Sequence, residues 1–142
     1  MNSGTAGRRG VVAVAVRQSC FLVIRRSEFV VAPGKYCFPG GGIAENECEE
    51  RAVIREMREE VGVDVRPICR LWRSVTPWGV PLAWWHVEMP AEFIFRPNPD
   101  EVASVGWMTL EELVARNDLL ESNQHFLAAL RRGEILLDMP PS

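Results

Sequence analysis

The sequence has no hydrophobic run long enough to cross a membrane. Its longest apolar stretch near the start covers residues 11–16 and ends at Arg17, whereas a membrane-spanning helix needs about 20 apolar residues. The first ten residues contain two arginines, but no adequate apolar stretch follows them, so they do not fit a secretory signal. We therefore expect a cytoplasmic protein that does not contact the membrane.

Cysteine and histidine are too few and too scattered to form a structural zinc site. The four cysteines are Cys20, Cys37, Cys48 and Cys69, and none of them belongs to a C-x-x-C pair. Neither of the two histidines lies at zinc-ligand spacing from a cysteine. We expect the cysteines to be reduced thiols, as is usual in the cytoplasm.

An excess of positive charge is also missing. Lys and Arg total 16 against 19 Asp and Glu, which gives a formal net charge of −3. Proteins that bind DNA or RNA by neutralising phosphates are normally basic, so we expect no nucleic-acid partner. This charge does not exclude a small phosphate-bearing substrate held through metal ions.

What remains is the composition of an ordinary soluble domain. The 142 residues are 47% hydrophobic and 25% charged, which rules out a largely disordered chain, a collagen-like repeat and a small disulfide-dependent protein. A chain of this length can bury one sizeable core, and no internal repeat or linker divides it. We predict a single domain over residues 1–142, with residues 1–9 flexible and 138–142 forming a tail.

Apolar runs, turn residues and capping residues predict an α/β fold. The segment from Ser27 to Tyr36 is predicted to be a loop, and Gly62 is placed to end a helix. The spacing of Thr109 and Glu112 predicts a capping box at the start of another helix. We expect strands at 11–16, 21–24, 37–38, 65–75, 83–89, 92–95 and 102–108, and helices at 47–61, from 109 onward and at 122–132. This order predicts a mixed sheet flanked by helices.

Three glutamates share one face of the predicted helix at 47–61. Glu56, Glu59 and Glu60 lie within one turn, next to the apolar stripe that the helix would bury. Their mutual repulsion at the border of a buried face requires a compensating positive charge, and clustered carboxylate oxygens suit Mg²⁺ or Mn²⁺. Taken alone, the pattern also fits a solvated helix face made soluble by neighbouring arginines.

The residues around these glutamates favour the metal site. Residues 41–63 read GGIAENECEERAVIREMREEVGV, which matches G-x5-E-x7-R-E-U-x-E-E-x-G-U, the Nudix box, where U is a bulky aliphatic residue. The matching positions are Gly41, Glu47, Arg55, Glu56, Met57, Glu59, Glu60, Gly62 and Val63. The chain therefore resembles a Nudix hydrolase, and in particular the MutT-like branch of that family.

The resemblance implies an α/β/α sandwich around a mixed β-sheet, and a metal-dependent enzyme. Members of the family hydrolyse a phosphoanhydride bond of a nucleoside diphosphate linked to another group, using Mg²⁺ or a similar divalent ion. The MutT-like branch converts a nucleoside triphosphate to the monophosphate and pyrophosphate, and this is the activity that we predict. The family includes both monomers and homodimers, and the sequence does not distinguish them.

Two alternatives to this activity stay open. One is a pyrophosphatase for ADP-ribose or ADP-sugars, for which Pro77, in the loop after the motif, is a weak marker. The other is a module that binds a nucleotide without cleaving it, although no carboxylate of the box is lost here. Cleavage of capped RNA is disfavoured by the acidic charge balance.

The resemblance assigns metal ligands by position. Glu56, Glu59 and Glu60 would bind the metal, together with the backbone carbonyl of Gly40. Glu101, six residues before a tryptophan-led strand end, would be a fourth metal carboxylate or the general base. The alternative is an exposed loop acid beside Asp100. Either Glu59 or Glu101 would act as the general base, since the family does not use one fixed position.

An orienting ion pair is also implied. Glu47 and Arg55 would form this pair beside the metal ligands. However, Glu59 is at position i+4 from Arg55, so the sequence leaves the partner of Arg55 open.

Four residues are predicted to bind the substrate. Arg26 follows the predicted second strand, where an arginine of the family contacts phosphate, and its forked guanidinium suits that task. The alternative is that one of Arg25 and Arg26 is only a solvated surface residue. Gly41 and Gly42 belong to a run of three glycines, where the backbone can approach a ligand closely. Asn123 is either a base-recognising amide or a helix N-cap.

The five tryptophans are expected to pack in the core or on the sheet. Trp84 and Trp85 are consecutive in a predicted strand, so they should point to opposite faces. One of them could stack on a base, but packing is the simpler expectation. The same holds for Trp72, Trp78 and Trp107.

Overall fold

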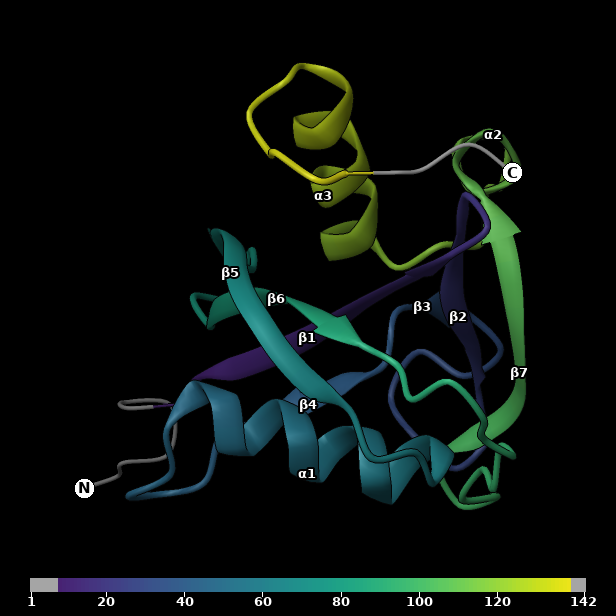
Figure 1. The fold of residues 1–142 in the computed structure, drawn as a ribbon. Coiled ribbons are helices and arrows are strands. Elements are labelled where there is room, and N and C mark those ends of the chain that lie inside the picture. The colour runs from purple at the N-terminus through teal and green to yellow at the C-terminus, as the bar shows by residue number, and fades with distance from the viewer. Residues whose placement is uncertain (1–7, 139–142) are drawn as a thin grey trace.

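The computed structural model describes residues 8–138. Positions 1–7 of the predicted flexible segment and 139–142 of the predicted tail lie outside the described residues. The described chain forms a seven-stranded sheet with helices on both of its faces (Figure 1). None of its helices is both long enough and apolar enough to pass through a bilayer.

The strands and helices follow the predicted order. The strands are β1 (Gly10–Arg17), β2 (Cys20–Arg26), β3 (Tyr36–Cys37), β4 (Gly40–Gly42), β5 (Arg66–Val75), β6 (Pro81–Glu88) and β7 (Val102–Thr109). The helices are α1 (Glu49–Val61), α2 (Leu110–Val114) and α3 (Glu121–Arg131). Apart from β4 and the segment 92–95, these elements agree with the predicted ones to within about two residues at each end.

The strand β1 lies at the centre of the mixed sheet. It pairs antiparallel with β2 and β4 and parallel with β6, in the order β3-β2-β1-β6-β5, while β7 pairs with β2. The ladder between β1 and β2 is limited to the residues next to their turn, and the two strands then diverge (Figure 1). In this opening β4 pairs with the first residues of β1, with Gly42 opposite Gly10 and Gly40 opposite Val12.

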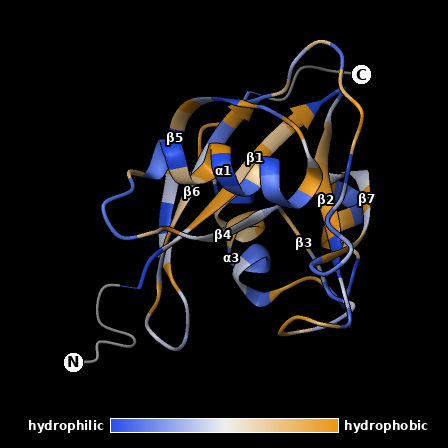
Figure 2. Cartoon of the chain, turned by 90° about the horizontal axis from the view of Figure 1, so that it is seen from below, coloured by the Kyte–Doolittle hydropathy of each residue, from blue (hydrophilic) through white to orange (hydrophobic). Residues whose placement is uncertain are grey.

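Helices pack on both faces of the sheet. On one face α1 buries Val53 and Met57. On the other face Phe126 of α3 stacks on Trp84, with ring centroids 4.7 Å apart. Trp84 and Trp85 belong to the two opposite cores, as expected for neighbours in a strand. In Figure 2 the strands behind α1 are coloured mainly apolar, whereas much of the outward side of α1 is hydrophilic. The architecture is the predicted α/β/α sandwich.

The helix end predicted at Gly62 and the helix start predicted at Thr109 are confirmed. Gly62 adopts a left-handed conformation with φ of 73°, and its N–H donates to the carbonyls of Met57 and Arg58. A Cβ at Gly62 would lie 2.7 Å from the Cβ of Arg96, so glycine is required there. Thr109 and Glu112 form the expected capping box at the start of α2.

The predicted strand at 92–95 is wrong. This segment is irregular, and the N–H of Arg96 donates to the carbonyl of Val61 at the end of α1 instead of joining a sheet ladder. Phe93 and Phe95 contact each other, with centroids 4.9 Å apart, and pack against the core on the α1 side. The apolar alternation that predicted a strand therefore reflects side-chain packing without strand pairing.

Candidate active site

The glutamates on α1 take different positions relative to the glycine strand β4. Glu56 and Glu60 are buried, whereas the Glu59 side chain is 51% exposed. Glu60 accepts a hydrogen bond of 2.9 Å from the N–H of Gly40 through Oε1. The Glu56 carboxylate lies against Gly41, where an added Cβ would come within 2.4 Å of it. Glycine is therefore needed at position 41 to leave room for Glu56.

Burial makes the negative charges on Glu56 and Glu60 costly. Desolvation raises the pKa of Glu60 from 4.5 to about 8, partly opposed by the Gly40 N–H and reinforced by the charges of Glu56 and Glu101. The pKa of Glu56 is also raised, mainly by burial, although the Arg55 guanidinium opposes this. Two adjacent buried carboxylates of this kind favour a nearby positive charge.

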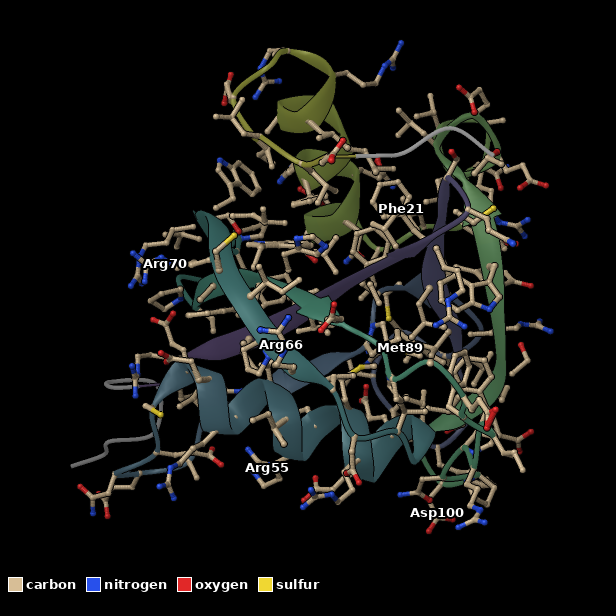
Figure 3. All side chains as sticks on the ribbon, in the orientation of Figure 1. Phe21, Arg55, Arg66, Arg70, Met89 and Asp100 are labelled. Atoms are coloured by element: carbon tan, nitrogen blue, oxygen red, sulfur yellow. The ribbon has the colours of Figure 1, made fainter. Side chains whose placement is uncertain are left out.

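Arg55 supplies positive charge to several of these carboxylates. Its guanidinium donates to both carboxylate oxygens of Glu47, at 2.8 and 2.9 Å. It also donates to Glu56 at 2.9 Å and to Glu59 at 3.2 Å. Arg55 projects from α1 in Figure 3, and it further donates to the carbonyl of Gly42 at 2.8 Å. The sequence left Glu47 and Glu59 as alternative partners of Arg55, and both are partners.

The ion pair also fixes the loop before α1. Hydrogen bonds from Arg55 and from the N–H of Ala44 lower the pKa of Glu47 to about 2. Glu47 lies in the loop, and the helix begins at Glu49 instead of the predicted residue 47. The link from Glu47 through Arg55 to Gly42 holds this loop, the helix and β4 together.

The carboxylate oxygens of Glu56, Glu59 and Glu60 suit a hard divalent cation, although they are not arranged around a common point. Among residues 8–138, no three acidic, histidine or cysteine side chains lie close enough together to hold an ion. Arg55 occupies oxygens of Glu56 and Glu59 instead. The chemistry of the set is nevertheless suitable, because Glu56 and Glu60 are buried oxygen donors beside a strand without side chains. Glu59 is exposed enough to turn toward them.

Glu101 lies in the loop before β7, in electrostatic contact with this group. In addition to burial, its charge contributes to the raised pKa values of Glu56 and Glu60. Its carboxylate accepts a hydrogen bond of 3.0 Å from the side chain of Asn98, and its carbonyl accepts one of 3.0 Å from Ser27. The fold thus brings the fourth predicted carboxylate toward the two buried ones, while its role remains a prediction.

A cleft of about 600 Å³ borders the glycine strand. All four predicted substrate-binding residues line it, namely Arg26, Gly41, Gly42 and Asn123. The remaining lining residues include Gly40, Val31, Trp78, Arg8 and Arg9, and no Asp or Glu is among the described ones. The cleft is therefore positively charged, although the whole chain has a net charge of −3.

Asn123 is not the N-cap of α3, so that alternative is wrong. The N-cap is Leu120, and Asn123 is buried in the first turn. Its side-chain oxygen accepts a hydrogen bond of 2.8 Å from the N–H of Phe38, and its amide nitrogen donates to Ser122 at 3.1 Å. The amide is thus fixed at the cleft wall, and each of its polar atoms keeps capacity for one further hydrogen bond.

Trp78 was expected to pack, but its side chain is 71% exposed. It lies in the β5–β6 hairpin loop, which is closed by hydrogen bonds between Thr76 and Val80 and contains Gly79 with φ of 88°. This turn presents the ring at the cleft. The sequence Thr-Pro-Trp-Gly between two strands contained the necessary signal, because an aromatic residue at a turn has little to pack against.

Known proteins share both this sequence pattern and this fold. A family model described as the NUDIX domain matches residues 7–130. The NAD-capped RNA hydrolase NudC of Stutzerimonas stutzeri (strain A1501) is 31% identical over 108 residues, which cover 74% of this chain and 37% of that protein. The 8-oxo-dGTP diphosphatase of Proteus vulgaris is 50% identical over 32 residues, or 22% of this chain and 29% of that protein.

A solved structure extends the comparison to the fold. The MutT protein from Methanosarcina mazei Go1 superposes with a TM-score of 0.75, covering 88% of this chain and 93% of that one at 22% identity. Its resemblance covers the sandwich as a whole. In contrast, the chain spans only 37% or less of the length of the two curated relatives described above.

Proposed function

We propose that this chain, which belongs to the Nudix hydrolase family, is a Mg²⁺-dependent pyrophosphohydrolase of nucleotides. Its substrate is a nucleoside diphosphate linked to another group, and we infer a nucleoside triphosphate that is cleaved to the monophosphate and pyrophosphate. The observation that carries this proposal is the contact of two buried carboxylates with β4: Glu56 fills the space beside Gly41, and Glu60 binds the Gly40 N–H. The positively charged cleft on the same strand supports a polyphosphate substrate.

Residues of α1 and β4 would support a metal-assisted hydrolysis. Glu56, Glu59 and Glu60 would hold Mg²⁺ or Mn²⁺, with the Gly40 carbonyl as a further ligand. When bound, such an ion neutralises phosphate charge and lowers the pKa of a coordinated water. Arg55 would release Glu56 and Glu59 to the ion while keeping its two hydrogen bonds to Glu47.

The remaining groups bind the substrate and move a proton. Arg26 lines the cleft, and its guanidinium would bind phosphate oxygens. Glu59 or Glu101 would accept the proton of the attacking water as the general base. Asn123 would offer its remaining hydrogen-bonding capacity to the base, and Gly41 and Gly42 would let the phosphates approach the backbone.

A substrate panel tests this proposal. The chain is assayed with Mg²⁺ against canonical and oxidised nucleoside triphosphates, ADP-ribose, ADP-sugars, dinucleoside polyphosphates and NAD-capped RNA. We expect the highest kcat/KM with a nucleoside triphosphate, and pyrophosphate instead of phosphate as the product. Turnover confined to ADP-ribose or ADP-sugars would support the first alternative. Nucleotide binding without hydrolysis of any compound would support a non-catalytic binding module.

We expect Trp78→Ala to raise the KM for the preferred nucleotide about 10-fold, with a smaller effect on kcat. Stacking of a base on an aromatic ring contributes about 1–3 kcal/mol, and Trp78 is the exposed aromatic side chain in the described lining of the cleft. Steady-state kinetics measure the effect, and Trp78→Phe should restore most of the affinity. Phe29→Ala is a matched control, because Phe29 is 72% exposed but does not line the cleft. Equal KM values for Trp78→Ala and wild type would rule out stacking on Trp78.

A further inference from the structure

Two arginines at one end of the cleft have no task in the proposed reaction. Arg8 and Arg9 directly precede β1, and both line the cleft. The carbonyl of Arg9 accepts a hydrogen bond of 2.9 Å from the N–H of Ile43, and the next residue, Gly10, is in register with Gly42. Arg9 is therefore anchored to the ladder between β1 and β4 at the edge of the cleft.

Both side chains are exposed, and among residues 8–138 they have no acidic partner. Within the part of the chain that the structure describes, neither guanidinium forms an ion pair or a side-chain hydrogen bond. Arginines elsewhere are commonly paired, as Arg66 is with Glu88 at 2.6 Å and Arg70 with Glu49 at 3.5 Å on β5 (Figure 3). An anion could thus bind Arg8 and Arg9 without displacing a carboxylate.

These arginines lie away from the carboxylates. The start of β1 is beside the N-terminal half of α1, whereas the end of β2, with Arg26, is beside its C-terminal end (Figure 1). Glu60 binds Gly40, and Arg9 binds Ile43, three residues further along the chain. At a rise of about 3.3 Å per strand residue, these two points are roughly 10 Å apart. The backbone of Arg9 and the carboxylate of Glu60 therefore contact different positions along this segment. A phosphate held by the arginines is accordingly assigned to a part of the nucleotide other than the cleaved anhydride, and the ribose is the part that carries further phosphates.

We propose that Arg8 and Arg9 form a second anion subsite, which binds a phosphate attached to the ribose of the nucleotide whose 5′-polyphosphate is cleaved. This inference rests on the proposed function. The ligand class is a nucleoside 5′-polyphosphate with a further phosphate on its 2′ or 3′ oxygen, either as a monoester or as a diester to a following nucleotide. Two guanidinium groups provide several N–H donors for such a phosphate, and their exposure lets it enter from solvent.

The test compares ligands that differ by one phosphate. Dissociation constants are measured by calorimetry with Mg²⁺ and α,β-methylene adenosine triphosphate, which resists cleavage. Its 2′-phosphate and its 3′-phosphate are the monoester ligands, and the dinucleotide extended by a 3′-phosphodiester is the diester ligand. We expect at least one ribose phosphate to tighten binding roughly 5- to 10-fold at about 50 mM salt, with a smaller gain at higher salt. A gain with the monoester alone identifies a small nucleotide, and a gain with the diester identifies an RNA 5′ end.

Arginine variants assign the gain to this subsite. In the Arg8→Gln/Arg9→Gln double variant, the ligands with and without a ribose phosphate should bind equally well, so the ratio of their dissociation constants should fall to about 1. Arg131→Gln removes an exposed arginine of α3 outside this cleft and should keep the wild-type ratio. Equal affinity of the wild-type protein for all of these ligands, or a gain that persists in the double variant, would overturn the proposal. If the wild-type protein bound the ribose phosphate through Arg8 and Arg9 but hydrolysed no compound in the substrate panel, only the proposed function would be overturned.

Discussion

We expect Glu60→Gln to stabilise the metal-free protein. The pKa of Glu60 is raised from 4.5 to about 8 by burial, so the folded protein favours the protonated carboxyl. The stability that this proton provides is fully present below pH 4.5 and is lost as the pH rises toward 8, because the folded protein then has to bury a charge. Glutamine has the same shape without the charge, and its oxygen can still accept the hydrogen bond from Gly40. In the presence of a chelator, the melting temperature of the variant should exceed that of the wild type by roughly 5–10 °C at pH 8, and by little near pH 4.5.

The same substitution should remove the response to Mg²⁺. Mg²⁺ should raise the melting temperature of the wild-type protein, because it binds only the folded state, and should have little effect on the variant. We expect kcat/KM to fall by at least about 100-fold. Thermal melts between pH 4.5 and 9 with and without Mg²⁺, together with steady-state kinetics, measure these effects. Glu121→Gln, which changes an exposed acid of α3, serves as the control. A Glu60→Gln protein that retained Mg²⁺-dependent stabilisation and turnover would contradict the metal assignment.

Gly41→Ala should inactivate the enzyme while leaving it folded. The new Cβ would lie within 2.4 Å of the Glu56 carboxylate, so the Glu56 side chain must move away from β4. Because the Glu56 side chain is flexible, it can move aside while the backbone stays in place. We therefore expect a loss of stability of only about 1–3 kcal/mol. Displacement of one metal-binding carboxylate should lower kcat/KM by about 100-fold and weaken the binding of Mg²⁺.

A second glycine in a strand provides the matched control. Gly106 in β7 has no atom within 4 Å of its ideal Cβ position, so Gly106→Ala should keep near wild-type activity and Mg²⁺ affinity. Activity assays and calorimetric Mg²⁺ titrations of both variants test the comparison. If Gly41→Ala matched Gly106→Ala in both measurements, the contact between Gly41 and Glu56 would have no functional importance.

The sequence carried most of the information about α1 and its carboxylates. Helical periodicity placed Glu56 and Glu60 at the border of the buried face, and both are buried. The capping patterns at Gly62 and Thr109 were equally informative, because a left-handed glycine and a capping box depend on local interactions alone. Local rules therefore located the elements that carry the candidate site.

Features that depend on contacts across the chain were less predictable. β4 consists of glycines, which propensity disfavours in strands, and it is specified by pairing with β1 and by the space that Glu56 requires. Phe93 and Phe95 alternate like strand residues but have no strand to pair with. The turn sequence around Trp78 was a signal for its exposure, but its position at the cleft is defined only by the folded chain.

Manganese binding followed by electron paramagnetic resonance tests the central claim most directly. Wild-type protein and a Glu56→Gln/Glu60→Gln variant are stripped of metal, titrated with Mn²⁺ and assayed in parallel for nucleotide hydrolysis. We predict that the wild type immobilises Mn²⁺ and regains activity as the ion is added, and that the double variant does neither. Undiminished hydrolysis by the stripped wild type, or equal Mn²⁺ binding by the double variant, would contradict the assignment of these buried carboxylates.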